Sequence, residues 1–222
     1  MLDAFGTMLA LEPPLPRLAA GLEAIGHPHP SQVIERAFQA EVAHYRANHL
    51  RGVDPPAVRA LRRECAGVMA RSLGPGAPAP EALEGVLMDA LHFTLAPDAR
   101  EVLDELAARG TPVALVSNWD ASLRGLIERL GVADRFAAIC TSAECGFAKP
   151  DRRIFRLALA RLSVPPECAV HCGDDPLLDG LGAAAAGVTP VILTRSDTTV
   201  DRRFRSISRL SELQNDEVMF QN

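Results

Sequence analysis

The sequence lacks several features that mark particular classes of protein. It has no basic excess: 23 Lys and Arg against 28 Asp and Glu give a formal charge of −5, which argues against binding to nucleic acid. Its longest apolar stretch, residues 180–193, is shorter than the ~18 residues of a membrane span and contains Gly187 and Pro190. The five cysteines are odd in number and show no C-x-x-C spacing. We therefore expect a soluble, cytoplasmic protein that binds neither nucleic acid nor membranes.

The first half of the chain has the apolar periodicity of helices. Its 222 residues, 48% of them hydrophobic, are enough for one globular core and a smaller insertion. Three apolar stripes and one weaker helix, separated by Gly and Pro, lie between residues 13 and 92. The stripes are Leu15, Leu18, Leu22 and Ile25; Ile34, Phe38, Val42 and Tyr45; and Val58, Leu61, Cys65 and Val68; the weaker helix is 81–91. We predict that residues 13–92 form an all-helical insertion.

From residue 96 the pattern alternates between helices and short β-rich runs. We expect helices at 98–109, 121–130, 151–162 and 177–186, and strands at 112–116, 136–140, 168–172 and 189–193. Met1 and Leu2 form the end of a first strand, which is either a stub or the remainder of a strand that begins upstream. The alternation predicts an α/β fold: a Rossmann-like, doubly wound parallel sheet built from residues 1–12 and 93–222. Residues 211–222 are a candidate flexible tail.

Polar residues follow several of these strands. Asp3 precedes a Gly-Thr turn, Ser117 and Asn118 follow the run at 112–116, and Asp174 follows the run at 168–172. Parallel sheets bind ligands beyond the carboxyl ends of their strands, which is where these residues fall. Asp3 can serve as a nucleophile, and Ser117 and Asn118 can hold oxyanion oxygens. A turn residue and a helix cap are the simpler explanations.

A lysine and a group of acids complete the candidate site. Lys149-Pro150 stands at the entrance of a predicted helix, where the ammonium can screen an anionic substrate from a carboxylate. Asp174, Asp175 and Asp179 lie within six residues after an apolar run. Such crowding is repulsive unless a cation joins the carboxylates, and Mg²⁺ prefers oxygen ligands. A helix amino end capped by acids is the alternative, but with Asp3 included a Mg²⁺ site is the better interpretation.

In order and context, four segments resemble the motifs of the haloacid dehalogenase-like hydrolase superfamily. They are Asp3-Ala4-Phe5-Gly6-Thr7, Val116-Ser117-Asn118, Lys149-Pro150-Asp151, and Gly173-Asp174-Asp175 with Asp179. The resemblance covers essentially the whole chain. It implies that the helical insertion is a cap domain that closes over the active site and supplies substrate selectivity.

The resemblance also implies roles for these residues. Asp3 would be a nucleophile that forms a covalent aspartyl intermediate, Ser117 would bind the transferring group, and Lys149 would neutralise charge. Asp174 would ligate Mg²⁺ together with Asp3 and the main-chain carbonyl of Phe5, and Asp175 and Asp179 would tune the site from outside the ligand set. We expect substrate contacts from Thr7, Asn118 and Trp119, although core packing explains Trp119 equally well.

Phe5 departs from the pattern of the family's phosphatases. These carry a second Asp at this position, which protonates the leaving group and then activates water, and Phe can do neither. The dehalogenase branch has an aromatic residue here and expels halide, which needs no proton, but it uses no metal and lacks the Gly-Asp-Asp arrangement.

Three hypotheses follow. The leading one is a Mg²⁺-dependent phosphatase of a small, anionic phosphorylated metabolite, slowed by Phe5. The alternatives are a 2-haloacid dehalogenase-type hydrolase and a catalytically impaired metal-binding or interaction protein on the same scaffold.

Overall fold

The protein is described by a computed structural model over residues 1–195 and 203–214. The chain forms two compact units. Residues 1–10, 95–119 and the described residues from 123 onward make up the first, here called the sheet unit. Residues 11–94 and 120–122 make up the second, here called the helical unit. Two short strands, β1 (Leu9–Leu11) and β2 (Phe93–Leu95), pair with each other where the chain passes from one unit into the other.

The sheet unit is built on parallel strands. β3 (Ala114–Ser117) pairs with β4 (Ala138–Thr141), and β5 (Val170–Gly173) pairs with β6 (Thr189–Leu193), which pairs with β7 (Arg205–Ile207). The first three residues join the two groups, because Leu2 forms parallel bridges to Leu115 of β3 and to Cys172 of β5. The amide of Leu2 donates to Ala114 at 2.9 Å and that of Asp3 donates to Cys172 at 2.9 Å. Asp3 therefore ends the central strand of the sheet.

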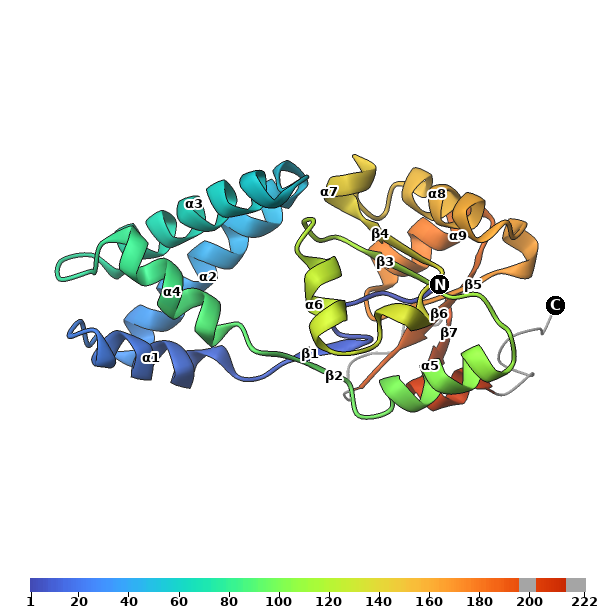
Figure 1. Ribbon diagram of the computed structural model, residues 1–222, viewed down its shortest axis with the longest axis horizontal. Helices are drawn as coiled ribbons and strands as arrows, with labels where there is room; N and C mark the ends of the chain where they lie inside the picture. The colour runs from blue at the N-terminus through green and yellow to red at the C-terminus, as the bar shows by residue number, and fades with distance from the viewer. Residues whose placement is uncertain (196–202, 215–222) are drawn as a thin grey trace. The chain divides into compact units, whose positions relative to one another are not determined.

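Helices cover both faces of this sheet (Figure 1). α8 (Arg152–Leu162) and α9 (Gly182–Ala186) bury Ile154, Phe155 and Ala183 against one face. α5 (Ala99–Ala108) and the 3₁₀ helix η5 (Leu210–Gln214) bury Leu103, Leu210 and Leu213 against the other. The strands are short and buried on both faces, as expected for a parallel sheet between two helical layers. The remaining elements are α6 (Leu123–Arg129), α7 (Ser142–Cys145), η2 (Ala133–Arg135), η3 (Pro166–Cys168) and the π-helical η4 (Pro176–Leu181).

The helical unit contains α1 (Pro14–Ala24), α2 (Ser31–Asn48), α3 (Pro55–Leu73), α4 (Pro80–Ala90) and the 3₁₀ turn η1 (His49–Arg51). The apolar stripes predicted from periodicity meet in a single core that includes Leu18, Leu22, Ile34 and Leu61. Residues 120–122 belong to this unit because Asp120 accepts a hydrogen bond from the Tyr45 hydroxyl at 3.2 Å and Ala121 donates to the Gly52 carbonyl at 2.8 Å.

The predicted α/β class is confirmed, with several corrections to the elements. Three predicted strands lie later than expected, at 114–117, 138–141 and 170–173, because backbone pairing extends through polar Ser117 and Thr141. The helix expected at 177–186 divides into η4 and α9, and β1, β2, β7 and α7 were missed. Residues 215–222 of the expected tail lie outside the described residues, whereas 211–214 belong to η5. No helix in the described part of the chain combines the length and apolarity needed to cross a membrane.

Core packing on the α5 face makes a direct stability prediction. Leu103 is fully buried in the sheet unit, whereas Leu177 is 57% exposed. We expect Leu103→Ala to lower the free energy of unfolding in urea by ~2–5 kcal/mol, because it removes apolar contacts and leaves a cavity. Leu177→Ala should change that free energy by less than ~0.5 kcal/mol. Equal effects of the two substitutions would contradict the packing described here.

Candidate active site

The four segments singled out from the sequence converge at one edge of the sheet. Asp3 ends the central strand, Ser117 ends β3, and Asp174 follows β5. Lys149 lies between α7 and α8. Since parallel strands end at the same edge of a sheet, residues more than a hundred positions apart come into contact there.

Lys149 is the centre of this cluster. Its ammonium donates hydrogen bonds of 2.6 Å to Asp3 Oδ1 and of 2.6 Å to Asp179 Oδ1. All three side chains are buried, and such ions are stable only when paired. Burial opposes the charged form of Lys149, but the two carboxylates outweigh it and raise its pKa above the ordinary value. Lys149 therefore remains an ammonium at neutral pH.

Asn118 holds the backbone of Lys149 in place. The Lys149 amide donates to Asn118 Oδ1 at 2.7 Å, and Asn118 Nδ2 donates to the Lys149 carbonyl at 3.0 Å. The sequence predicted that Asn118 contacts substrate. In the structure both polar atoms of its side chain are engaged by one backbone residue, so Asn118 positions the lysine.

His171 was missed by sequence reasoning. It lies on β5, is fully buried, and its Nε2 is 2.8 Å from Asp179 Oδ1. Burial lowers the pKa of His171 to about 4, so the ring is neutral and Nε2 carries the proton that Asp179 accepts. Lys149 and His171 together hold the pKa of Asp179 below its ordinary range despite its burial. The sequence did contain a signal for it, because His171 is the one polar side chain within the otherwise apolar run that forms β5.

Two glycines allow the acids to lie against the backbone. A Cβ at Gly6, whose φ is +82°, would lie 2.1 Å from Asp174 Oδ2. A Cβ at Gly173 would lie 2.1 Å from Asp179 Cγ. Position 6 therefore favours glycine for two reasons. Its backbone is in the left-handed region, and the missing side chain leaves room for the Asp174 carboxylate.

Asp175 has the structural role that the sequence offered as the alternative for these acids, the capping of a helix amino end. Its Oδ1 accepts hydrogen bonds from the amides of Leu177 at 2.8 Å and Leu178 at 3.0 Å, so its side chain caps η4. Its own amide donates to Asp179 Oδ2 at 3.1 Å. Asp175 thus orients Asp179 through its backbone, whereas we expected its carboxylate to act on the site.

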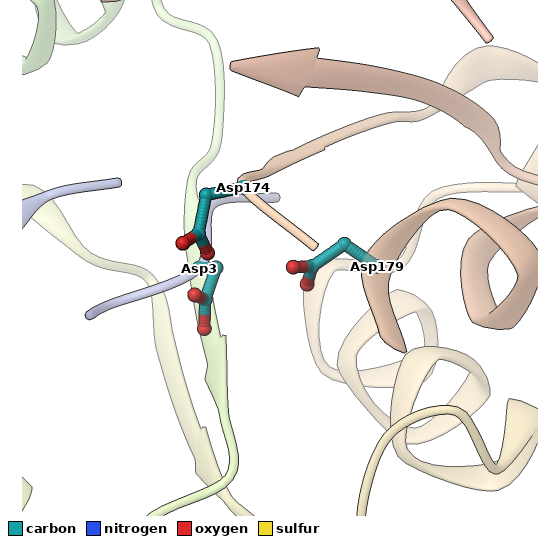
Figure 2. Close-up of side chains that lie close together, drawn as sticks. All are labelled: Asp3, Asp174 and Asp179. Carbon is teal, nitrogen blue, oxygen red and sulfur yellow. The ribbon is translucent and has the colours of Figure 1, made fainter. Parts of the chain in front are cut away.

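Asp3, Asp174 and Asp179 form a group whose chemistry fits a divalent cation. One oxygen from each carboxylate lies within 4.8 Å of the other two, and Figure 2 shows the three side chains gathered from their separate segments. Burial and the neighbouring carboxylates raise the pKa of Asp3 to about 7, against the opposing effect of Lys149. Asp174 is more exposed, and partial desolvation together with Asp179 raises its pKa above the ordinary value. A bound cation would relieve this repulsion.

The free carboxylate oxygens indicate which residues would hold such a cation. Asp179 accepts hydrogen bonds at both oxygens. Among the described residues, Asp3 is bonded only at Oδ1 and Asp174 receives a hydrogen bond only from its own amide. Asp3 and Asp174 are therefore the better ligand pair, with Asp179 holding Lys149 beside them.

The other predicted site residues differ in their surroundings. Ser117 is buried at the end of β3, and Phe5 is 43% exposed two residues after Asp3. Thr7 is fully buried, and its hydroxyl has no partner among the described residues. Trp119 packs against the core of the sheet unit, which favours the packing explanation over substrate contact.

Comparison with known proteins identifies the family. Residues 1–187 match the family described as haloacid dehalogenase-like hydrolase. The chain belongs to this family. It is 38% identical over 123 residues to a phosphoserine phosphatase of Thermus thermophilus, an alignment that covers 54% of this chain and 49% of that protein. It is 37% identical over 107 residues to a ribulose-1,5-bisphosphate 5-phosphatase of Halopiger xanaduensis, covering 48% of this chain and 45% of that protein. The matches thus span about half the length of these relatives.

Solved structures of this haloacid dehalogenase-like family share the fold. A phosphatase from Thermococcus onnurineus superposes with a TM-score of 0.65 at 21% identity, covering 96% of this chain and 94% of that one. A 2-haloacid dehalogenase from Pseudomonas syringae superposes with a TM-score of 0.67 at 24% identity, covering 98% and 96%. These two structures superpose on this chain about equally well, so the fold does not decide the reaction.

The buried ion pairs of Lys149 predict a large effect of its removal. Lys149→Met leaves Asp3 and Asp179 facing each other without a cation, and we expect the free energy of unfolding in chelator to fall by ~3–5 kcal/mol. Adding Asp179→Asn to this variant should restore part of the loss, because one buried charge is then gone. The exposed ion pair of Arg153 provides the control, and Arg153→Met should have a far smaller effect. Equal losses for Lys149→Met and Arg153→Met would contradict the burial of the Lys149 cluster.

Proposed function

We propose that this chain is a Mg²⁺-dependent hydrolase of a small phosphate monoester, with Asp3 as the nucleophile. The observation that carries the proposal is the environment of Asp3: one oxygen is held by Lys149, and the other remains available beside Asp174. The phosphatases among the similar proteins support the same reaction class. A small anionic metabolite is the substrate class that fits, and the free cysteines support a cytoplasmic location.

In this proposal each residue near Asp3 has a distinct task. Lys149 fixes the orientation of the nucleophile and offsets the charge that an anionic substrate adds. Asp179 and His171 keep the lysine directed at Asp3. Ser117 binds an oxygen of the transferring phosphoryl group. Asp3, Asp174 and the carbonyl of Phe5 would hold Mg²⁺, which when bound supplies positive charge for the phosphate oxygens.

The covalent chemistry takes place at Asp3. One carboxylate oxygen of Asp3 forms a bond to phosphorus while the ester P–O bond breaks and the alcohol oxygen leaves with the bonding electrons. Water then cleaves the aspartyl phosphate, releases inorganic phosphate and regenerates Asp3. The leaving alcohol needs a proton, and Phe5 has none to give. We therefore infer slow turnover, or turnover of substrates that protonate their own leaving group.

Phe5 also favours a second candidate, the hydrolytic dehalogenation of a short 2-haloacid. In that reaction Asp3 bonds to carbon and halide leaves without a proton, so an apolar residue at position 5 is compatible with it. Asp174 and its contact with Gly6 have no function in that reaction, which is why we rank it second. In either case we propose that residues 11–94 act as a cap that selects the substrate.

Phosphate release tests the leading proposal. We expect release from at least one member of a broad panel of small phosphate monoesters in the presence of Mg²⁺, and loss of that release in chelator. Asp3→Asn should abolish it, because an amide oxygen is a poor nucleophile, whereas the exposed Asp134→Asn should not change it. If halide is released from a 2-haloacid in chelator and no phosphate monoester is hydrolysed, the second candidate is correct and the first is wrong.

Position 5 gives a separate test of the intact site. Phe5→Asp restores a carboxylic acid, and we expect it to raise kcat for phosphate release by ~10²-fold or more. Phe5→Asn, which has nearly the same shape as Asp but no titratable proton, is the matched control and should give no comparable gain. Equal rates for the two variants would exclude a missing proton donor as the limitation and would favour a binding role for this scaffold.

A further inference from the structure

The loop that follows β3 belongs in part to each of the two units. The chain leaves the sheet unit after residue 119 and returns to it at residue 123. We call residues 118–122 the crossing loop. Its first residue is Asn118, whose side chain bonds to the Lys149 backbone at 2.7 and 3.0 Å. The position of the crossing loop therefore bears directly on the position of Lys149.

Within the helical unit, Tyr45 and Asp120 bond to each other twice. The Tyr45 hydroxyl donates to Asp120 Oδ2 at 3.2 Å and accepts from the Asp120 amide at 3.3 Å. The ring of Tyr45 packs against the core of this unit, and Asp120 is buried. Asp120 Oδ1 accepts from the Ser122 amide at 2.8 Å, so both carboxylate oxygens have partners. A buried carboxylate needs such partners, and α2 supplies one of them through Tyr45.

Gly52 lets the crossing loop come close to the end of η1. The Gly52 carbonyl accepts from the Ala121 amide at 2.8 Å. A Cβ at position 52 would lie 2.6 Å from Asp120 Cβ, although the φ of −81° is an ordinary value for any residue. Glycine is therefore required here by the close contact and not by the backbone conformation. Tyr45 and Gly52 thus hold two consecutive residues of the loop.

Trp119 is held in the same way within the sheet unit. Its amide donates to Ser142 Oγ at 3.0 Å, and its carbonyl accepts from Ser142 Oγ at 3.2 Å and from the Ala143 amide at 3.2 Å. Ser142 is fully buried at the start of α7. The crossing loop is therefore bonded to a different segment of the chain at each successive residue.

A continuous series of bonds leads from the helical unit to the nucleophile. Tyr45 bonds to Asp120, Asn118 bonds to the Lys149 backbone, and the Lys149 ammonium bonds to Asp3 at 2.6 Å. One residue separates Asp120 from Asn118. Because peptide units are planar and each residue has only two soft dihedrals, so short a segment absorbs little displacement.

We propose that Tyr45 is a positioning residue for Lys149. By holding Asp120 it fixes the crossing loop, and the loop fixes the lysine backbone through Asn118. The helical unit thereby sets how the ammonium meets the Asp3 carboxylate. The consequence for turnover rests on the proposed function, whereas the consequence for the backbone at Lys149 does not.

Two substitutions loosen the crossing loop in different ways. Tyr45→Phe keeps the ring but removes the hydroxyl, and Gly52→Ala pushes a methyl group against Asp120. In each variant we expect amide hydrogen exchange, followed by NMR, to become ~10-fold faster or more at Asp120 and at Lys149, because their acceptors are displaced. The Cys172 amide, which donates within the sheet at 3.0 Å, should change by less than ~3-fold.

Matched variants in the helical unit provide the controls. Gly85→Ala adds the same methyl group to α4, where a Cβ meets nothing within 4 Å. His27→Ala removes a 2.8 Å hydrogen bond to the Gly76 carbonyl. Both should leave exchange at Lys149 within ~2-fold of the unsubstituted protein, because neither touches the crossing loop.

Phosphate release provides a second measurement. We expect Tyr45→Phe to lower kcat by ~10-fold and to change KM by less than ~3-fold, because a displaced lysine weakens the transition state more than it weakens substrate binding. The Gly85→Ala variant should keep the kcat of the unsubstituted protein.

Three results would overturn the proposal. One is exchange at Lys149 that rises no more than exchange at Cys172. Another is a rise at Asp120 alone, because Trp119 would then absorb the displacement. The third is an active enzyme whose kcat is unchanged in both Tyr45→Phe and Gly52→Ala. If no phosphate monoester is hydrolysed, the proposed function fails, and hydrogen exchange still decides this inference.

Discussion

The burial of one ammonium between two carboxylates is the constraint around which the site is arranged. Lys149 bonds to Asp3 and Asp179 in a place from which water is largely excluded, so none of the three charges is stable alone. Each partner is then fixed by a further contact. Asn118 holds the lysine backbone, His171 and the Asp175 amide hold Asp179, and the sheet holds Asp3. This arrangement fixes the orientation of the Asp3 carboxylate.

The same arrangement explains why the site is suited to a divalent cation. Desolvation raises the pKa values of Asp3 and Asp174, and the neighbouring carboxylates, which one lysine cannot balance, raise them further. An additional positive charge beside their free oxygens would stabilise the ionised forms. In the proposed function the acidic cluster suits phosphate chemistry, whereas Phe5 suits a leaving group that needs no proton. This conflict between Phe5 and the acidic cluster bears on the rate and the substrate of the proposed reaction.

Much of the fold followed from local patterns. The helical stripes around Leu18, Ile34 and Leu61 predicted α1 to α3, because apolar periodicity reflects burial directly. The alternation after residue 96 predicted the parallel sheet, and thereby the edge at which Asp3, Ser117 and Asp174 meet. Strands β1, β2 and β7 were missed because each is three residues long, too short for a period of two to be recognised. The one-turn helix α7 was missed for the same reason.

The sequence by itself determined the residues that carry charge at this site and the strand ends from which they project. Only the tertiary structure decided which partner each residue has. Asp179 bonds to Lys149 and His171, the Asn118 side chain bonds to the Lys149 backbone, and Asp175 caps the start of a helix. The physical reason is that a motif specifies which donors and acceptors are present, whereas their partners depend on what else is buried within about 3 Å. Strands distant in the chain supply those partners, so no local pattern contains them.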